Sequence, residues 1–417
     1  MKAIIYGAGN IGRGFLGHIF SRSDYELTFI DTADTVVEGL NREGRYPMRI
    51  LTEGNTEDIW IEGVKAINSK NEEDAADAIA AADIMTTAVG VRSLPLVAPV
   101  IAAGLKKRFA RKQAAEGFTS ELRGSPPAHF NIIICENLIN ADKTLKDLIK
   151  KQLSKEEQKI FDETVGLVEA SIGRMVPLQT KEMQDGNPLR VCVEAYDFLP
   201  VDKSAFKGEI PLLAGVIPFE NFNFYIQRKL FVHNMGHGIC AYFGLIRGDR
   251  YMYEAANHGG ILFIAQNAML ESALALSARY QVPLADIHYH IRDLLQRFSN
   301  KALEDTCARV GADTPRKLGN QDRFIGALRC CTEEGIHPAF VSAGTSAALY
   351  WHLREQGIPQ SREAALRALK EVSGLPNADA EKILVFHSLL SQSDDFDKNI
   401  EKIIKIACDE GQKPGII

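Results

Sequence analysis

The feature that most constrains the fold is a glycine-rich turn directly after the first apolar run of the chain. Residues 3–6 read Ala-Ile-Ile-Tyr, and a Gly-x-Gly-x-x-Gly pattern occupies residues 7–12. An amphipathic stretch over residues 13–21 leads into a second apolar run, which ends at Asp31. This order predicts a strand, a glycine turn, a helix and a second strand, which together form one βαβ unit.

The rest of the chain indicates two domains, since 417 residues exceed the size of one ordinary domain. Candidate strands at 84–89 and 131–135 are separated by alanine-rich helical stretches, and residues 190–196 alternate like a last strand. From about residue 221 helical periods dominate. We therefore expect an α/β domain over residues 1–200, with a doubly wound, mainly parallel sheet, and a mainly α-helical domain over residues 201–417.

The glycine turn predicts a dinucleotide site. Gly7 allows the tight turn, Gly9 lets a pyrophosphate approach the backbone, and Gly12 lets the helix pack close to its strand. The carboxylate of Asp31 suits ribose hydroxyls and repels a 2′-phosphate, which favours NAD, although Arg13 beside the turn leaves NADP open. The alternative is a glycine turn that binds nothing. The residues expected to contact the cofactor are Gly7, Ala8, Gly9, Asn10, Ile11, Gly12, Asp31, Thr87, Ala88 and Val89.

A second informative stretch surrounds Lys229. No proline falls between residues 218 and 283, so one long helix can run through it. On an α-helix Asn234 lies about 140° and His237 about 80° from Lys229, so the three share one arc. Gly236 and Gly238 flank the histidine, which is easier to understand if a ligand or another backbone passes close by.

These residue types suit the oxidation of an alcohol without a metal. A desolvated lysine can lose its proton near neutral pH and serve as a base. The carboxamides of Asn234 and of Asn137, which follows another predicted strand, could hold the oxygen. His237 could orient the lysine or bind a neighbouring hydroxyl. The alternative is a surface lysine with unrelated polar neighbours, and spacing alone does not separate the two.

Composition excludes several other classes. A net charge of −6 disfavours nucleic-acid or anionic-membrane partners, and no apolar run reaches membrane-spanning length. The first glycine comes too early for a secretory signal. Seven cysteines without a Cys-x-x-Cys pair predict no disulfide framework, no zinc site and a cytoplasmic location. We expect the basic run 106–112 to be a solvated helix end, the pair His288 and His290 to bind no metal, and the pair Cys330 and Cys331 to pack in the core.

With these residues in view, the sequence resembles the polyol-specific long-chain dehydrogenases. The resemblance implies an NAD-dependent, metal-independent enzyme whose active site lies between a Rossmann domain and a helical domain. It implies that Lys229 is the general base, that Asn137 and Asn234 stabilise the oxyanion, and that His237 is a partner of the substrate or the lysine. It fades in the last seventy residues and after residue 105. The stretches that carry it are residues 2–15, 86–90, 136–137 and 201–208, the Lys-x-x-x-x-Asn-x-x-His signature at 229–237, 316–318 and 322–323.

The opening residues 7–15 are similar to the branch of the family that acts on phosphorylated polyols. The reaction implied is the interconversion of mannitol 1-phosphate and fructose 6-phosphate by a monomer or small homo-oligomer. The alternatives are a mannitol 2-dehydrogenase, a reductase of fructuronate or tagaturonate, and an NAD-sensing regulator that performs no chemistry. A substrate phosphate needs cations, and the candidates are Lys203, Lys207, Arg316, Lys317 and Arg323.

Overall fold

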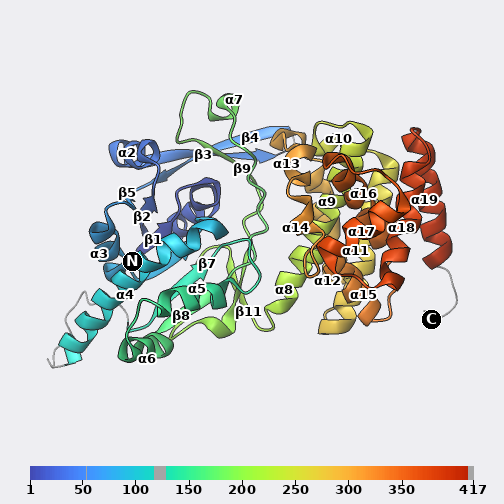
Figure 1. The fold of residues 1–417 in the computed structure, drawn as a ribbon. Coiled ribbons are helices and arrows are strands. Elements are labelled where there is room, and N and C mark those ends of the chain that lie inside the picture. The colour runs from blue at the N-terminus through green and yellow to red at the C-terminus, as the bar shows by residue number, and fades with distance from the viewer. Residues whose placement is uncertain (53, 117–127, 412–417) are drawn as a thin grey trace. The chain divides into compact units, whose positions relative to one another are not determined.

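The computed structural model describes residues 1–52, 54–116 and 128–411, and the chain divides into two compact units, Met1–Phe222 and Asn223–Ile417 (Figure 1). The expected boundary was residue 200, and the division in the structure lies 22 residues further along the chain, after Phe222. Strand β10 (Leu199–Asp202) pairs with β11 (Val216–Phe219), which keeps the segment between them in the first unit. We call the two parts unit 1 and unit 2 and describe each by itself.

Unit 1 is built on a parallel sheet of six strands in the order β5-β2-β1-β6-β7-β8. Counted along the chain within this sheet, the order is 3-2-1-4-5-6, which is the Rossmann arrangement. The expected doubly wound sheet is therefore confirmed. Its strands are β1 (Lys2–Tyr6), β2 (Glu26–Asp31), β5 (Val64–Asn68), β6 (Ile84–Thr87), β7 (Phe130–Ile134) and β8 (Val165–Glu169).

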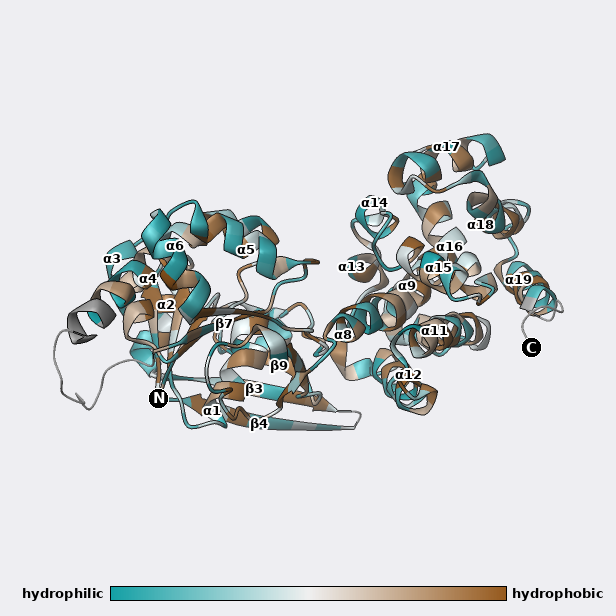
Figure 2. Ribbon diagram, turned by 90° about the horizontal axis from the view of Figure 1, so that it is seen from below, coloured by the Kyte–Doolittle hydropathy of each residue, from teal (hydrophilic) through white to brown (hydrophobic). Residues whose placement is uncertain are grey.

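Apolar cores lie on both faces of this sheet, because the side chains of each strand alternate between the faces. One core receives residues from four helices, and in Figure 2 α5 and α6 lie on one side of the sheet while α1 lies on the other. The helices of unit 1 are α1 (Gly17–Ser21), α2 (Asp34–Glu43), α3 (Glu72–Ala81), α4 (Leu94–Glu116), α5 (Ala141–Lys150), α6 (Lys155–Thr164) and α7 (Lys181–Gln184).

A second, three-stranded sheet was not predicted. Strand β3 (Arg45–Thr52) pairs with β4 (Asn55–Glu62) on one side and β9 (Val191–Glu194) on the other. The interpretation of residues 190–196 as the last strand of the main sheet was wrong, because β9 belongs here and β8 ends the main sheet. All four residues of β9 are buried, so the pattern of residues 190–196 identifies a strand but does not identify the sheet that it joins.

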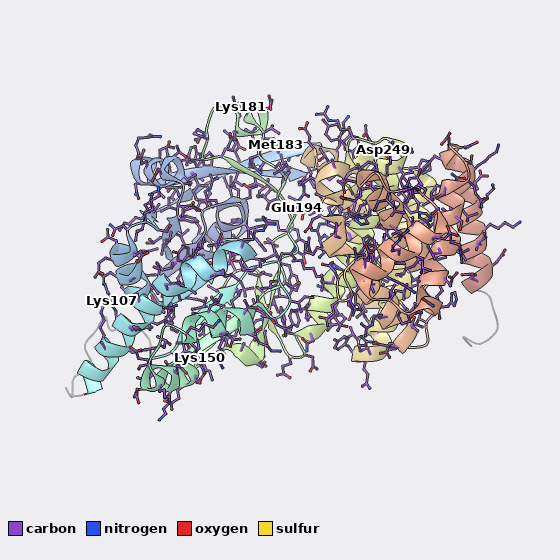
Figure 3. The ribbon with its side chains drawn as sticks, viewed as in Figure 1. Lys107, Lys150, Lys181, Met183, Glu194 and Asp249 are labelled. Carbon is purple, nitrogen blue, oxygen red and sulfur yellow. The ribbon has the colours of Figure 1, made fainter. Side chains whose placement is uncertain are left out.

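The basic run 106–112 lies in the carboxyl-terminal half of α4, as expected (Figure 3 labels Lys107), but the expectation that it is solvated is wrong for Arg108. Lys107 pairs with Glu73 at 2.5 Å and with Asp77 at 2.9 Å, both on α3. Arg108 is buried and donates a hydrogen bond to the Ala82 carbonyl at 2.8 Å. These contacts join α4 to its neighbours, and the expected loop over residues 117–127 lies outside the described residues.

All helices and strands assigned within the described residues of unit 2 are helices, and an isolated bridge joins Tyr251 and Thr306. The helices α9, α11 and α16 pack against one another, and the first half of α16 is buried on every side. Cys330 and Cys331 are buried in α15, as core packing requires. The helices of unit 2 are α8 (Asn223–Arg228), α9 (Met235–Arg247), α10 (Met252–Ala256), α11 (Gly259–Tyr280), α12 (Leu284–Phe298), α13 (Cys307–Gly311), α14 (Thr314–Lys317), α15 (Ile325–Glu333), α16 (Ala339–Glu355), α17 (Arg362–Ser373), α18 (Asn377–Ser391) and α19 (Phe396–Gly411).

Helix α11 meets the length and composition of a membrane span, although it contains Glu271 and Arg279. Half of its most apolar stretch is buried inside the structure. The core helix of a folded domain passes the same criteria, so this single helix is weak support for a membrane segment.

Candidate active site

The glycine turn leaves β1 at its carboxyl end and packs tightly against the rest of unit 1. Gly7 has a φ of +106°, and a Cβ on it would lie 2.3 Å from the Ala88 carbonyl oxygen. A Cβ on Gly12 would lie 1.8 Å from the Gly7 carbonyl oxygen. Both positions therefore require glycine for the turn itself, before any ligand is considered.

Gly9 differs from these two glycines in a way that fits a cofactor. It is exposed, and a Cβ on it would meet no described heavy atom within 4 Å. A helix begins directly after it at Asn10, and the first backbone N–H groups of a helix have no partner within the helix. Gly9, Asn10 and Ile11 thus form an open cradle of N–H groups that suits a pyrophosphate.

Asp31 lies beside this cradle at the end of β2. Its carboxylate accepts hydrogen bonds from the Ala8 N–H at 2.6 Å and from the Ala33 N–H at 2.9 Å. The carboxylate therefore braces the turn. Contact with the ribose stays a prediction.

Arg13 does not serve the role that left NADP open. Its guanidinium is buried and donates to the carbonyls of Ala8, at 2.7 Å, and of Leu189. The Tyr46 hydroxyl in turn donates to the Arg13 carbonyl at 2.7 Å. Arg13 ties the turn to the strand region around Leu189, so this part of the sequence interpretation is corrected.

The segment after β6 is held by a residue to which the sequence analysis gave no role. Glu136 accepts hydrogen bonds from Val89 N–H at 2.9 Å and from Gly90 N–H at 2.8 Å. Burial raises the pKa of this carboxyl. The signal that could have found it is an acidic residue directly after a buried parallel strand. Thr87 and Ala88 lie on this segment, at the carboxyl edge of the sheet.

Asn137 follows Glu136 and is exposed in the loop after β7. The next loop is held in the same way as the segment after β6, because Glu169 at the end of β8 accepts the Ala141 N–H at 2.8 Å. Burial raises the pKa of Glu169 to about 7. Three carboxylates thus brace three loops along one edge of the sheet.

In unit 2 the helix around Lys229 contains a π-helical segment, η4 (Lys229–Asn234), between α8 and α9. The Met235 N–H donates to the Leu230 carbonyl, five residues earlier. A π-helix joins residues five apart by backbone hydrogen bonds and has more residues per turn than an α-helix, so Lys229 and Asn234 are closer in angle than the 140° of an α-helix. Single π turns recur at functional sites.

Gly236 and Gly238, on either side of His237, are needed for a different reason from the one expected. A Cβ on Gly236 would lie 2.4 Å from the Met269 sulfur, and one on Gly238 would lie 2.9 Å from the Phe324 ring. Side chains of the same unit, and neither a ligand nor another backbone, fill the space. The close approach of Phe324 also brings Arg323 next to Gly238, with its Cδ 3.8 Å from that Cβ position.

His237 is packed between an aromatic ring and a carboxylate. Its ring stacks on Phe298, with centroids 4.7 Å apart and an angle of 16° between the planes. Its Nε2 lies 3.6 Å from an oxygen of Asp305. Burial lowers the pKa of His237 to about 4, so the ring is neutral at pH 7.

His233, which the sequence analysis did not consider, lies one turn before His237. It is buried, and its ring centroid is 6.2 Å from that of His237 and 6.5 Å from that of His290. His288 is exposed. Within the described residues, no three His, Cys, Asp or Glu side chains are arranged to hold a metal ion. Catalysis without a metal remains a prediction.

The candidate phosphate ligands do not form one cluster. Lys203 pairs with Glu220 at 2.9 Å. Lys207 lines a cavity of about 490 Å³ with Met1, Asp83 and Asn131, at the amino edge of the main sheet. That edge is opposite the glycine turn, so the assignment of Lys207 to the substrate phosphate is corrected.

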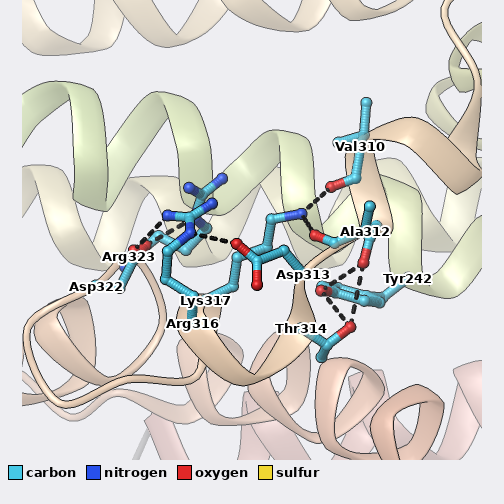
Figure 4. A network of polar contacts seen from close by, with 10 residues as sticks. Tyr242, Val310, Ala312, Asp313, Thr314, Arg316, Lys317, Asp322 and Arg323 are labelled. Atoms are coloured by element: carbon cyan, nitrogen blue, oxygen red, sulfur yellow. Dashed lines mark hydrogen bonds and ion pairs between the residues drawn. The ribbon is translucent and has the colours of Figure 1, made fainter. Parts of the chain in front are cut away.

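Figure 4 shows the other three candidates, which lie together in unit 2. Lys317 is buried and donates to the carbonyls of Val310, at 2.5 Å, and of Ala312. It therefore caps the end of α13, and its assignment to the phosphate is corrected as well. Arg316 and Arg323 both pair with Asp322, at 3.0 and 2.9 Å.

The cofactor candidates lie along the carboxyl edge of the sheet in unit 1. In unit 2, Lys229, Asn234 and His237 lie on one continuous helical stretch, and Arg323 lies beside Gly238. Asn137 belongs to unit 1, so its pairing with Asn234 around one oxygen stays a prediction.

Comparisons with known proteins match both units. The family model described as mannitol dehydrogenase Rossmann domain matches residues 1–215, and that of the mannitol dehydrogenase C-terminal domain matches residues 221–406. The family likeness thus continues through the helices where the sequence resemblance was expected to fade. A mannitol-1-phosphate 5-dehydrogenase of Shouchella clausii is 37% identical over 91% of this chain and 96% of its own length. One from Brevibacillus brevis is 33% identical over 90% of this chain and 94% of its own length.

Two solved structures share the fold. A Pseudomonas fluorescens mannitol 2-dehydrogenase, in a ternary complex with NAD and D-mannitol, aligns with a TM-score of 0.74 at 14% identity, over 97% of this chain and 94% of that one. A D-sorbitol dehydrogenase in substrate-free form aligns with a TM-score of 0.74 at 15% identity, over 96% and 94% of the two chains.

Proposed function

The chain belongs to the mannitol dehydrogenase family, and we propose that it interconverts mannitol 1-phosphate and fructose 6-phosphate with NAD. It is an NAD-dependent polyol dehydrogenase. The observation that carries the choice of substrate is the 37% identity to a mannitol-1-phosphate 5-dehydrogenase over nearly the whole of both chains.

The cradle at Gly9, Asn10 and Ile11 would hold NAD, which would supply the acceptor for the hydride released from the carbon that bears the reacting hydroxyl. We propose that the Lys229 amine takes the hydroxyl proton during oxidation and returns it during reduction. Asn137 and Asn234 donate carboxamide N–H groups to the same oxygen as negative charge develops on it. The π-helical segment supports this assignment, because its wider turn reduces the angle between Lys229 and Asn234 on one helix. Neutral His237 binds a neighbouring hydroxyl.

Arg316 and Arg323 are the cations that we propose for the substrate phosphate. Arg323 lies beside Gly238, one residue from His237, and the arginine fork suits a phosphate. Arg323→Gln is expected to raise the KM for fructose 6-phosphate at least about tenfold and to leave the KM for NADH unchanged. Lys207→Gln, at the far edge of unit 1, is the matched control. Equal KM values in both variants would exclude Arg323.

The proposed substrate is tested by comparing the NADH-dependent reduction of fructose 6-phosphate, fructose and tagaturonate under the same conditions. We expect the kcat/KM for fructose 6-phosphate to be at least about 100-fold above the values for the other two sugars. A sugar without the phosphate would lose its interaction with the arginines, which is worth about 3 kcal/mol. Activity confined to an unphosphorylated sugar would favour the mannitol 2-dehydrogenase or hexuronate reductase alternatives. NADH binding without turnover of any sugar would favour a regulator.

We propose a cytoplasmic location and a monomer or small homo-oligomer. All seven cysteines are free thiols, as in proteins of reducing compartments. Light scattering on the purified chain measures the oligomeric state, and fractionation of cells measures the location.

A further inference from the structure

The carboxylate that faces His237 is itself held rigidly. Arg309 donates from Nε and Nη2 to the two carboxylate oxygens of Asp305, at 2.6 and 2.5 Å. The Asp305 backbone carbonyl accepts the Met252 N–H at 2.8 Å. The side chain of Asp305 is only 6% exposed. Its position is therefore determined by a two-pronged ion pair and by the backbone, and it does not depend on His237.

His237 has little freedom to turn away from this carboxylate. The Phe298 ring covers one face of the imidazole, and Asp305 stands 3.6 Å from Nε2. This separation is an electrostatic contact, slightly longer than a hydrogen bond. Hydrogen bonds of catalytic groups are often long before the substrate is bound and shorten in the complex.

We propose that Asp305, clamped by Arg309, is a positioning residue that keeps the proton of His237 on Nε2 and leaves Nδ1 as a hydrogen-bond acceptor for a hydroxyl of the polyol. The second half of this assignment rests on the proposed function. The first half concerns the protein alone, because a negative charge at one edge of a neutral imidazole favours the tautomer whose N–H points toward it.

Asp305 does not make His237 charged, because burial and the nearby arginines outweigh it. What Asp305 can control is the tautomer of the neutral His237 ring. Arg309, Arg323 and Arg297 disfavour an imidazolium at His237, as burial does, and only Asp305 favours one. His233 is also neutral, because burial keeps its pKa well below the usual value. A neutral ring has one donor and one acceptor nitrogen, so the choice between them decides which substrate groups it can bind.

The tautomer is measured by ¹⁵N NMR of the full-length chain labelled at histidine, with His237 assigned from the spectrum of His237→Gln. We expect the Nε2–H form in the unsubstituted chain, and a mixture or the Nδ1–H form in Asp305→Asn. Asp305→Glu keeps the charge and should retain Nε2–H. The Nδ1–H form in the unsubstituted chain, or a tautomer that Asp305→Asn leaves unchanged, would overturn the proposal.

Kinetics test the positioning role. Asp305→Asn should lower kcat for mannitol 1-phosphate oxidation about 10- to 100-fold and leave the affinity for NADH unchanged. Asp379→Asn, which removes a carboxylate from the ion pair with Lys382 on α18, is the matched control and should retain the full kcat. If Asp305→Asn does not fold, Arg309→Gln removes the clamp and keeps the carboxylate, and it should retain Nε2–H with a smaller loss of kcat.

The outcomes separate the two proposals. The expected tautomer together with equal kcat values for Asp305→Asn and Asp379→Asn would overturn the positioning role. The expected tautomer in a chain that turns over no polyol phosphate would overturn the proposed function and leave the role of Asp305 in setting the tautomer intact.

Discussion

Three acidic residues hold the loops at the carboxyl edge of the main sheet in unit 1. Asp31, Glu136 and Glu169 each stand at or just after the end of a strand and accept backbone N–H groups from the loop after the neighbouring strand. A carboxylate that binds N–H groups holds a loop at a fixed height above the sheet. The backbone that would contact a cofactor is thereby held in place before the cofactor arrives.

Asp31 combines this bracing with the proposed choice of cofactor, and two variants separate the roles. Asp31→Asn keeps an oxygen for the Ala8 N–H and removes the charge, so we expect the ratio of kcat/KM for NADP to that for NAD to rise at least about tenfold. Asp31→Ala also removes the brace and should weaken NAD binding further. Kinetics with both cofactors measure the ratio, and an unchanged preference in both variants would refute the role of the charge.

Lys229 is the residue on which the proposed chemistry depends. Lys229→Ala should lower kcat about 10³-fold or more, because a general base contributes roughly 10² to 10⁴ in rate. NADH binding, followed by fluorescence, should persist because the glycine turn belongs to unit 1. Lys382→Ala, which removes a lysine from an ion pair of unit 2, should keep both properties. Loss of NADH binding together with turnover in Lys229→Ala would indicate misfolding or a wrong assignment.

At the scale of elements, each unit contains a short π-helical segment where a functional stretch lies. One, η1 (Gly12–Leu16), begins at the last glycine of the turn, and the other, η4, begins at Lys229. Both widen a helix by one residue per turn and so change which side chains lie above one another. The 100° per residue of an α-helix therefore overestimates the angle between Lys229 and Asn234.

The glycine turn supports a paired prediction. Gly9→Ala should leave the melting temperature unchanged, because the added Cβ has open space, and should weaken NADH binding about tenfold or more by filling the cradle. Gly12→Ala should destabilise unit 1 by about 2 kcal/mol or more, because its Cβ would overlap the Gly7 carbonyl oxygen. Calorimetry and NADH titration measure the two effects. A Gly9→Ala variant that binds NADH normally would contradict the cradle.

At the scale of the whole molecule, buried ionisable groups join elements that are distant in sequence and make the stability depend on pH. Glu271 on α11 accepts the Phe340 and Val341 N–H groups at the start of α16, both at 2.9 Å. Burial raises the pKa of Glu271 to about 8. The folded chain therefore binds a proton at this carboxyl more tightly than the unfolded chain does.

The protonated carboxyl of Glu271 stabilises the fold at low pH, and this contribution decreases as the pH rises. The stabilisation from this proton is complete below the pKa of the unfolded chain, about 4.3, and is lost as the pH rises toward about 8. Glu271→Gln cannot titrate, so its melting temperature should fall less between pH 5 and pH 8 than that of the unsubstituted chain. Differential scanning calorimetry across this range measures both slopes, and parallel slopes would exclude Glu271 as the cause.

The sequence by itself determined the features that depend on local pattern. Short stretches of sequence predict four of these features, because backbone sterics and side-chain period act over a few residues. They are the turn at residues 7–12, the parallel sheet, the helical second half, and the spacing of Lys229, Asn234 and His237. Short stretches of sequence did not predict the π turn, the partners of His237 or the partners of individual charged side chains.

Only the tertiary structure decided which polar residues are used to hold the fold. Arg13 reaches the carbonyl of Leu189, 176 positions away, and Lys317 turns inward to close α13 instead of facing solvent. The contacts of Glu136 with Val89 and of Asp305 with His237 arise in the same way, between segments that are distant in the sequence. A charged side chain looks alike in sequence whether it meets water, a carbonyl or a ligand, because its partner is chosen by contacts between distant segments.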